Sequence, residues 1–345
     1  MAKQKIPDAS DRPNILWICT DQQRYDTIHA LGNEHIQTPN LDRLVREGVS
    51  FTHAHCQSPS CTPSRASFLT GLYPNTVHCT RNGNAYFPAN ERVEPITKRL
   101  ADVGYDCGLS GKLHIASAWS GEETRTDDGY SQFCYSHSPH QGIGTGNQYT
   151  DWLTQQGIDL DDILQKKNDN TYGPYQPNMD TRFHQTTWCA DRAIEFIESP
   201  HDGSWLMSVN PFDPHGPFDA PDSHRNRYNP AGLPTPLFQD TDLETQVRLK
   251  LYFGTKEANP PGEREQENKA SYYGMISLID DNVGRMLEAL EKTNQRDNTV
   301  VIFMSDHGEM LGDHGLTAKG SRFYEGLVRV PLIISWPGHF LQGHR

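Results

Sequence analysis

The stretch that decides the fold is 14–22, NILWICTDQ, in which an apolar run leads directly into an acidic residue. A second stretch, 299–308, TVVIFMSDHG, repeats this arrangement near the other end of the chain. Short apolar runs of this kind are typical of buried strands. The carboxyl ends of parallel strands line the ligand crevice of an open α/β sheet. We therefore expect the two acidic residues, Asp21 and Asp306, to meet at one edge of a sheet.

Amphipathic segments alternate with the apolar runs, which predicts an α/β fold with a mostly parallel central sheet and helices on both faces. The predicted helices run from Thr38 to Gly48, from Thr62 to Gly71, over 94–103 and over 266–293, and further strands are predicted over 205–209 and 330–335. We expect a single catalytic domain over 1–345. Two stretches, 116–180 and 211–262, lack a regular pattern, and each is either a functional loop or an irregular surface insertion.

Composition excludes several classes of protein. The 345 residues have a mean hydropathy of -0.72, and no apolar run approaches the roughly 20 residues of a membrane span. The net charge of -13 argues against nucleic-acid binding, and an anionic substrate would need a local cluster of cations. Seven thinly spread cysteines are not typical of a disulfide framework. The start has no apolar segment of the signal-peptide type, so we expect a cytoplasmic protein.

A third informative stretch is 61–71, CTPSRASFLTG. Thr62 and Pro63 predict a helix start just after Cys61, where free N–H groups and the helix dipole favour an anion. Arg65 lies one turn further on and can offer a bidentate fork to an oxyanion. An ordinary cysteine at this place would be a thiolate with a lowered pKa. Asn82, on the loop after this helix, could either reach a substrate oxygen or form a turn.

This stretch resembles the signature C-x-P-S-R…T-G of the formylglycine-dependent sulfatases, a family of the alkaline phosphatase superfamily. Other stretches resemble further family signatures in the same order: Gly104-Tyr105-Asp106…Gly111-Lys112-Leu113-His114, Asp213-Pro214-His215-Gly216-Pro217, Asp306-His307-Gly308-Glu309 with Lys319, and Glu325…Arg329-Val330-Pro331. The resemblance covers nearly the whole chain. It implies hydrolysis of a small-molecule or saccharide sulfate ester, and oxidation of Cys61 to formylglycine by a maturation enzyme. The hydrate of formylglycine would be the nucleophile.

The resemblance also implies one divalent cation held by Asp21, Gln22, Asp306, His307 and residue 61. Carboxylate and amide oxygens suit Ca²⁺ or Mg²⁺, and an imidazole also admits Mn²⁺. We expect Ca²⁺ first, with Mn²⁺ as its closest rival.

The remaining candidate residues would act on the ester itself. Arg65, Lys112 and Lys319 can supply the positive charge that a sulfate group needs. His215 is expected to protonate the leaving alcohol, with Lys319 as the next candidate. By resemblance to the family, His114 is the base that takes a proton from the second hydroxyl of the hydrate. Lys112 and His114 are two residues apart, so in an extended segment they would project from the same side.

Two departures from the family pattern keep alternatives open. The metal pairs are Asp21-Gln22 and Asp306-His307, whereas many sulfatases carry Asp-Asp and Asp-Asn. Such pairs resemble those of phosphonate monoester and phosphodiester hydrolases, which share the fold and the formylglycine, although Lys112 and His114 favour sulfate. A non-catalytic homologue that binds a sulfated ligand would leave Cys61 as a thiol.

The second departure is length. Family members usually continue into a smaller C-terminal subdomain after the last predicted strand. This chain therefore resembles the N-terminal catalytic domain of a longer protein, with the C-terminal subdomain missing.

Overall fold

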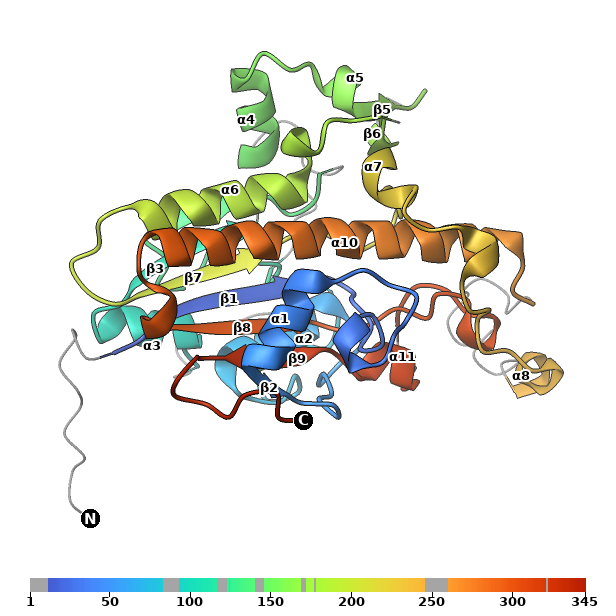
Figure 1. Cartoon of the computed structure of the whole chain (residues 1–345), viewed down its shortest axis with the longest axis horizontal. Coiled ribbons are helices and arrows are strands. Elements are labelled where there is room, and N and C mark those ends of the chain that lie inside the picture. Colours follow the sequence, from blue (N-terminus) through green and yellow to red (C-terminus); the bar gives the residue numbers. More distant parts are fainter. Residues whose placement is uncertain are drawn as a thin grey trace.

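The computed structural model describes residues 12–82, 93–116, 123, 125–139, 146–168, 172–176, 178–245, 260–320 and 322–345. A seven-stranded sheet with the order β2-β9-β8-β1-β7-β3-β4 forms its centre (Figure 1). Its strands are β1 (Asn14–Thr20), β2 (Gly48–Ser50), β3 (Asp106–Gly111), β4 (Gln132–Tyr135), β7 (Trp205–Asn210), β8 (Thr299–Ser305) and β9 (Leu332–Ser335). The predicted, mostly parallel sheet is confirmed. Only β9 runs against its neighbours, pairing antiparallel with both β8 and β2.

Helices cover both faces of this sheet, as the sequence predicted. The longer ones are α1 (Pro39–Glu47), α2 (Cys61–Thr70), α3 (Ile96–Asp102), α6 (Gln185–Glu198) and α10 (Glu263–Lys292). Alternate residues of β1 point to opposite faces. Leu16 and Ile18 are buried in the core formed with α1, α6 and α10. Ile15 and Trp17 pack into a second core on the side of α2 and α3, where the Trp17 ring lies 5.5 Å from that of Phe68.

The two stretches without a regular pattern contain short elements. Within 116–180 lie β4, α4 (Gln148–Gln155), α5 (Leu160–Ile163), β5 (Leu164–Lys166) and β6 (Tyr172–Tyr175). Strand β4 belongs to the central sheet, whereas α4, α5 and the β5–β6 pair gather beyond α6, where α4 still contacts β4 through Gln148 (Figure 1). Within 211–262 lie α7 (Asp222–Arg225) and α8 (Asp240–Thr245), and α11 (Glu325–Val328) precedes β9. Parts of both stretches, among them 140–145 and 246–259, lie outside the described residues.

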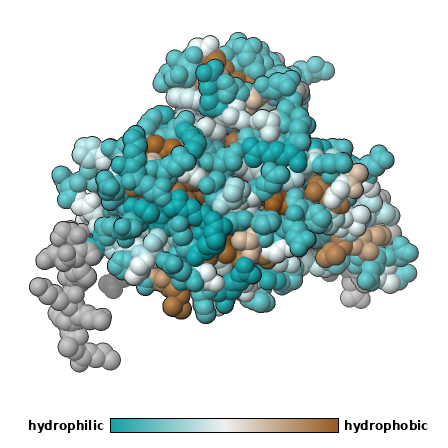
Figure 2. Space-filling view, in the orientation of Figure 1, coloured by the Kyte–Doolittle hydropathy of each residue, from teal (hydrophilic) through white to brown (hydrophobic). Residues whose placement is uncertain are grey.

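The surface is mainly hydrophilic on the face drawn in Figure 2, where hydrophobic residues form small separate patches. A search of the described part of the chain finds no helix with the length and apolar character of a membrane span.

Helix α1 has its N-terminus capped by a residue from another helix. Thr38 precedes the helix, but its hydroxyl donates to Asp42 instead of capping the helix start. The carboxylate of Asp280, on α10, accepts hydrogen bonds from the backbone N–H groups of Asn40 at 3.1 Å and Leu41 at 2.7 Å. This buried carboxylate therefore ties α1 to α10.

We expect Asp280→Ala to lower the free energy of unfolding by about 1–3 kcal/mol, because it leaves two buried helix donors without an acceptor. Urea unfolding followed by circular dichroism measures the loss. Asp281→Ala is the matched control, since this neighbouring carboxylate is partly exposed and pairs with His224 and Arg227. Equal losses in the two variants would contradict the capping role.

Candidate metal centre and active site

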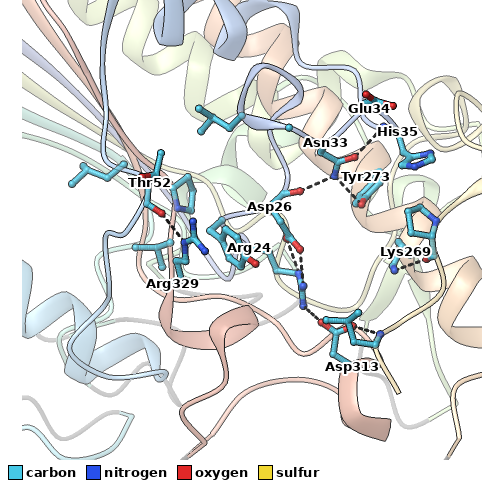
Figure 3. A pocket seen from close by; sticks show the side chains of 18 of the residues that line it. Arg24, Asp26, Asn33, Glu34, His35, Thr52, Lys269, Tyr273, Asp313 and Arg329 are labelled. Atoms are coloured by element: carbon cyan, nitrogen blue, oxygen red, sulfur yellow. Dashed lines mark hydrogen bonds and ion pairs between the residues drawn. The ribbon is translucent and has the colours of Figure 1, made fainter. Parts of the chain in front are cut away.

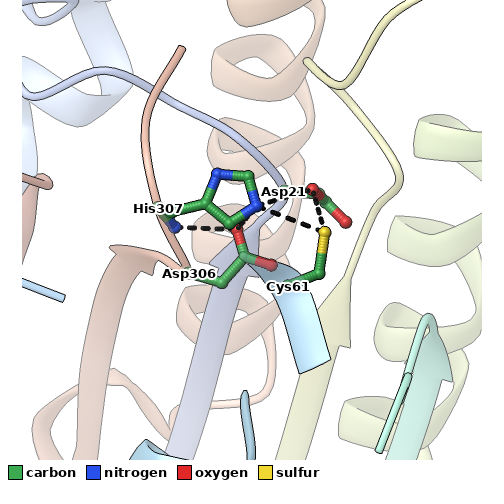
Figure 4. A group of neighbouring side chains, drawn as sticks. All are labelled: Asp21, Cys61, Asp306 and His307. Atoms are coloured by element: carbon green, nitrogen blue, oxygen red, sulfur yellow. Dashed lines mark hydrogen bonds and ion pairs between the residues drawn. The ribbon is translucent and has the colours of Figure 1, made fainter. Parts of the chain in front are cut away.

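Two strand ends and one helix start meet at the carboxyl edge of the sheet. Thr20 and Ser305 are register partners in β1 and β8, so the next residues, Asp21 and Asp306, lie side by side. One oxygen of each carboxylate, the Cys61 sulfur and a ring nitrogen of His307 all lie within 4.8 Å of one another (Figure 4). All four side chains are buried. The structure thus brings together four of the five predicted metal ligands through atoms that can bind a cation.

The His307 ring is oriented as a metal ligand would be. Its Nδ1 donates to the carbonyl of Gly308 at 2.9 Å, which leaves a lone pair on Nε2. Nε2 lies 3.2 Å from Cys61 Sγ, 3.7 Å from Asp306 Oδ1 and 3.9 Å from Asp21 Oδ1 (Figure 4). Burial alone would lower the pKa of His307, but the Asp306 carboxylate and the Cys61 sulfur together outweigh it, so the pKa is raised. The surroundings of this nitrogen therefore attract positive charge.

Gln22, the fifth predicted ligand, offers an oxygen with no hydrogen-bond partner. Its backbone N–H donates to Asp306 Oδ1 at 3.0 Å, and its side-chain Nε2 donates to Glu309. Its Oε1 is buried, and no described residue donates to it. Buried carbonyl oxygens are rarely left unpaired. Two carboxylates, an amide oxygen and an imidazole form a set of donors that fits a divalent cation.

Three cationic side chains surround the same cluster. Lys112 Nζ lies 2.5 Å from Asp21 Oδ2 and 4.0 Å from Cys61 Sγ. Lys319 Nζ lies 2.7 Å from Cys61 Sγ. The guanidinium of Arg65 donates through Nε to Asp306 Oδ2 at 2.9 Å and through Nη1 to the carbonyl of Lys112. All three predicted cations therefore lie at the cluster, and the fork of Arg65 is directed at Asp306 and the backbone.

The cations set the charge state of the cluster. Burial and Asp21 raise the pKa of the Cys61 thiol, but Lys112, Lys319 and His307 outweigh them, so the pKa is lowered. The predicted lowered pKa is confirmed, with these side chains as its cause. Burial likewise raises the pKa of Asp21, yet Lys112 and Lys319 hold it well below its usual range. The cluster therefore stabilises negative charge on residue 61 and on the Asp21 carboxylate.

Helix α2 begins two residues earlier than predicted, since the sequence pointed to Thr62 as its N-cap and Pro63 as its first residue. Cys61 is its first residue and Ser60 its N-cap. The Ser60 hydroxyl donates to Asn82 Oδ1 at 2.8 Å, and the same oxygen accepts from the backbone N–H of Thr62 at 3.1 Å. The carbonyl oxygen of Asn82 thus caps the start of α2, a role that the sequence did not predict. The start of α2, where Cys61 lies, is therefore held by a cap on Thr62 from 20 residues further along the chain.

The segment after Lys112 does not stay extended, so the condition under which Lys112 and His114 would project from one side of a strand is not met. His114 has a φ of 55°. The turn lets the backbone N–H groups of His114, Ile115 and Ala116 converge on the buried carboxylate of Glu123, at 2.6 Å for His114 and 2.7 Å for Ala116. The sequence could not reveal this contact, because Glu123 lies in a stretch without a regular pattern.

Both candidate acid–base histidines have neutral rings. Burial, reinforced by Lys112, holds the pKa of His114 well below its usual range, and its ring meets that of His137 edge-on at 4.4 Å. Burial and Lys319 do the same for His215, whose Nδ1 donates to the carbonyl of Gly216. A neutral ring suits a base. An anionic ester beside His215 would raise its pKa, because negative charge favours the protonated ring.

A cavity of about 440 Å³ is lined in part by Arg24, Asp26 and Asp313 (Figure 3). Arg24 in its wall bonds to both carboxylate oxygens of Asp26, forms an ion pair with Asp313 at 2.8 Å and donates to the carbonyl of Glu309 at 2.9 Å. One guanidinium group thus pairs with two carboxylates. The lining does not include Asp21, Cys61, Asp306 or His307, so the cavity is separate from the cluster and is linked to it through Glu309.

Comparisons with known proteins agree with this geometry. The family model for sulfatases matches residues 13–345. An arylsulfatase from Clostridium perfringens is 31% identical over 97% of this chain and 70% of its own length. A multifunctional alkaline phosphatase superfamily protein from Trinickia caryophylli, PehA, is 30% identical over 95% of this chain and 69% of its own. The crystal structure of a phosphonate monoester hydrolase from Agrobacterium radiobacter superposes with a TM-score of 0.78 at 27% identity, covering 95% of this chain and 69% of that one.

The chain is thus similar along nearly its whole length to about two thirds of several longer relatives. Family match, fold and cluster agree with one another, and the chain belongs to the sulfatase family, whose members are hydrolases of sulfuric esters.

Proposed function

We propose that the chain hydrolyses a sulfate monoester of a small molecule or saccharide to an alcohol and inorganic sulfate, with residue 61 as the nucleophile. The observation that carries this proposal is the placement of Cys61 Sγ, 2.7 Å from Lys319 Nζ, 4.0 Å from Lys112 Nζ and 3.2 Å from His307 Nε2. An anion would be stabilised at this point by two ammonium groups and by any cation that His307 helps to bind.

Asp21, Gln22, Asp306 and His307 would hold one divalent cation together with residue 61, and we propose Ca²⁺, with Mn²⁺ and Mg²⁺ as the ions to compare. When bound, such a cation makes a hydroxyl more acidic and withdraws charge from a sulfuryl oxygen. Conversion of Cys61 to formylglycine by a maturation enzyme would supply a hydrated aldehyde with two hydroxyls on one carbon.

The chain's own residues then have separate tasks. Lys112 and Lys319 bind and orient the negatively charged sulfate group, and Arg65 adds its positive charge while it holds Asp306. His215 gives a proton to the leaving alcohol, with Lys319 as the other donor. His114 takes a proton from the second hydroxyl of residue 61, so that the sulfate leaves and the aldehyde is restored. An ordinary serine has no second hydroxyl and would stay esterified, which is the reason for an oxidised cysteine.

A leaving-group series tests the role of His215. We expect His215→Ala to lower kcat/KM by less than about tenfold for 4-nitrophenyl sulfate, whose leaving group needs no proton, and by about 10²–10⁴-fold for an alkyl sulfate. The measurement is kcat/KM across aryl and alkyl sulfates of increasing alcohol pKa. An equal loss for all leaving groups would assign His215 to binding and transfer the acid role to Lys319.

A second candidate function is hydrolysis of a phosphonate monoester or a phosphodiester, because Gln22 and His307 occupy the metal pairs. Lys112, whose ammonium group lies 4.0 Å from Cys61 Sγ, and His114 favour sulfate, because by the family resemblance the phosphonate hydrolases tend to lack this lysine. The test is production of the chain with a maturation enzyme, followed by kcat/KM for aryl sulfate, aryl phosphonate and aryl diester esters with each metal. A preference for sulfate supports the proposal, and a preference for phosphonate or diester replaces it. A Cys61 that stays a thiol in such a host, with no turnover, would favour a binding protein.

A further inference from the structure

We propose that Glu309 is a positioning residue for the cation site. It fixes the side-chain amide of Gln22 so that Oε1 remains available to the cation, and it anchors the backbone beside Lys319. The inference rests on the proposed cation site. It concerns a residue that has no task of its own in the proposed hydrolysis of the ester.

The first step is the hydrogen bond between Glu309 and Gln22. Glu309 is 1% exposed, and its Oε2 accepts from Gln22 Nε2. An ionised carboxylate only accepts hydrogen bonds, so the amide of Gln22 must turn its NH₂ group toward Glu309. The amide oxygen then faces away, where no described residue donates to it.

The backbone of Gln22 is held in place by hydrogen bonds on both sides. Its N–H donates to Asp306 at 3.0 Å, its carbonyl accepts from the Tyr272 hydroxyl at 2.6 Å, and its φ is 72°. The orientation of the amide is therefore the main freedom left to this side chain. A flipped amide would offer two N–H groups to a cation instead of an oxygen.

The other carboxylate oxygen of Glu309 holds the loop that carries Lys319. Oε1 accepts from the backbone N–H groups of Leu311 at 3.1 Å and Ala318 at 2.5 Å. Ala318 directly precedes Lys319, whose Nζ contacts Cys61. From behind, Arg24 bonds to the Glu309 carbonyl and is itself held by Asp26 and Asp313 (Figure 3). One buried carboxylate thus connects a cation ligand with a residue of the sulfate site.

The test is a double-mutant cycle on metal affinity, measured by calorimetry with Ca²⁺ and Mn²⁺ on the protein that carries an unmodified Cys61. In Glu309→Gln, the new amide can donate to Gln22 Oε1 and take that oxygen from the cation, so we expect the affinity to fall about 10–100-fold. Gln22→Ala should lose a similar factor. In the Gln22→Ala background, Glu309→Gln should change the affinity less than about threefold, because the oxygen it controls is already absent.

Each outcome is decisive. A fall of equal size in both backgrounds would mean that Glu309 acts through its charge alone, and no fall in either would mean that it does not act on the site; both results overturn the inference. Absence of metal binding by the unsubstituted chain would instead overturn the proposed function. If Glu309→Gln does not fold, the double variant Gln22→Glu/Glu309→Gln restores the charge and the complementary hydrogen bond. It must then fold and bind metal within about threefold of the unsubstituted chain, and weaker binding would overturn the inference.

Discussion

Cys61→Ala, in a chain produced with a maturation enzyme, is expected to lose sulfate ester turnover by at least about 10⁴-fold, because the nucleophile is removed altogether. The substitution deletes only a sulfur at the first residue of α2, and the cap on this helix uses Asn82 and Thr62. The fold should therefore survive. Steady-state kinetics with an aryl sulfate measures the loss, and circular dichroism reports on the fold.

Cys56→Ala is the matched control for this prediction. Cys56 lies five residues earlier, is partly buried, and its thiol contacts the carbonyl of Leu327 and not the cluster. Activity of this variant should stay close to that of the unsubstituted chain. Residual turnover above about one part in 10³ in Cys61→Ala would contradict nucleophilic attack by residue 61.

Lys112→Met is expected to lower kcat/KM for a sulfate ester by about 10²–10³-fold, the usual effect of losing one preorganised charge at the reacting group. Methionine keeps the length and apolar stem of the side chain but removes the ammonium group beside Asp21 and Cys61. The same change leaves the buried carboxylate of Asp21 with one partner fewer. We therefore expect a metal-free protein destabilised by about 3–5 kcal/mol, and a melting temperature that depends on added Ca²⁺ more than that of the unsubstituted chain.

Lys292→Met controls for a general effect of removing a lysine, since the Lys292 side chain is 74% exposed and pairs with Glu198 at the surface. It should change neither kcat/KM nor the melting temperature appreciably. A loss of less than tenfold in Lys112→Met would contradict a role for this ammonium group in binding the sulfate.

The sequence was sufficient for the features that depend on local pattern. Strands β1 and β8 are continuous apolar runs, so their burial was predictable, and their parallel pairing brings Asp21 next to Asp306 without further information. The antiparallel direction of β9 was not predictable. Its apolar run looks like that of the parallel strands, and its direction is set by its pairing with β2 and β8.

Contacts between side chains that are far apart in the sequence could not be predicted from local sequence patterns. The first turn of α2 is capped by Asn82, so the start of this helix was misplaced by two residues. His114 has a positive φ, and the backbone N–H groups of His114 and Ala116 both donate to the Glu123 carboxylate. Glu309 belongs to a recognisable stretch, yet its contacts with Gln22 and Ala318 follow only from the fold.

The central claim is that residues from two strand ends and one helix start share a single cation. It is tested most directly by a crystal of the chain grown with Mn²⁺ and measured at the manganese absorption edge. The account predicts one anomalous peak at bonding distance from Asp21, Asp306 and His307, beside residue 61. Manganese bound only elsewhere, or side chains too far apart to reach the same ion, would contradict it.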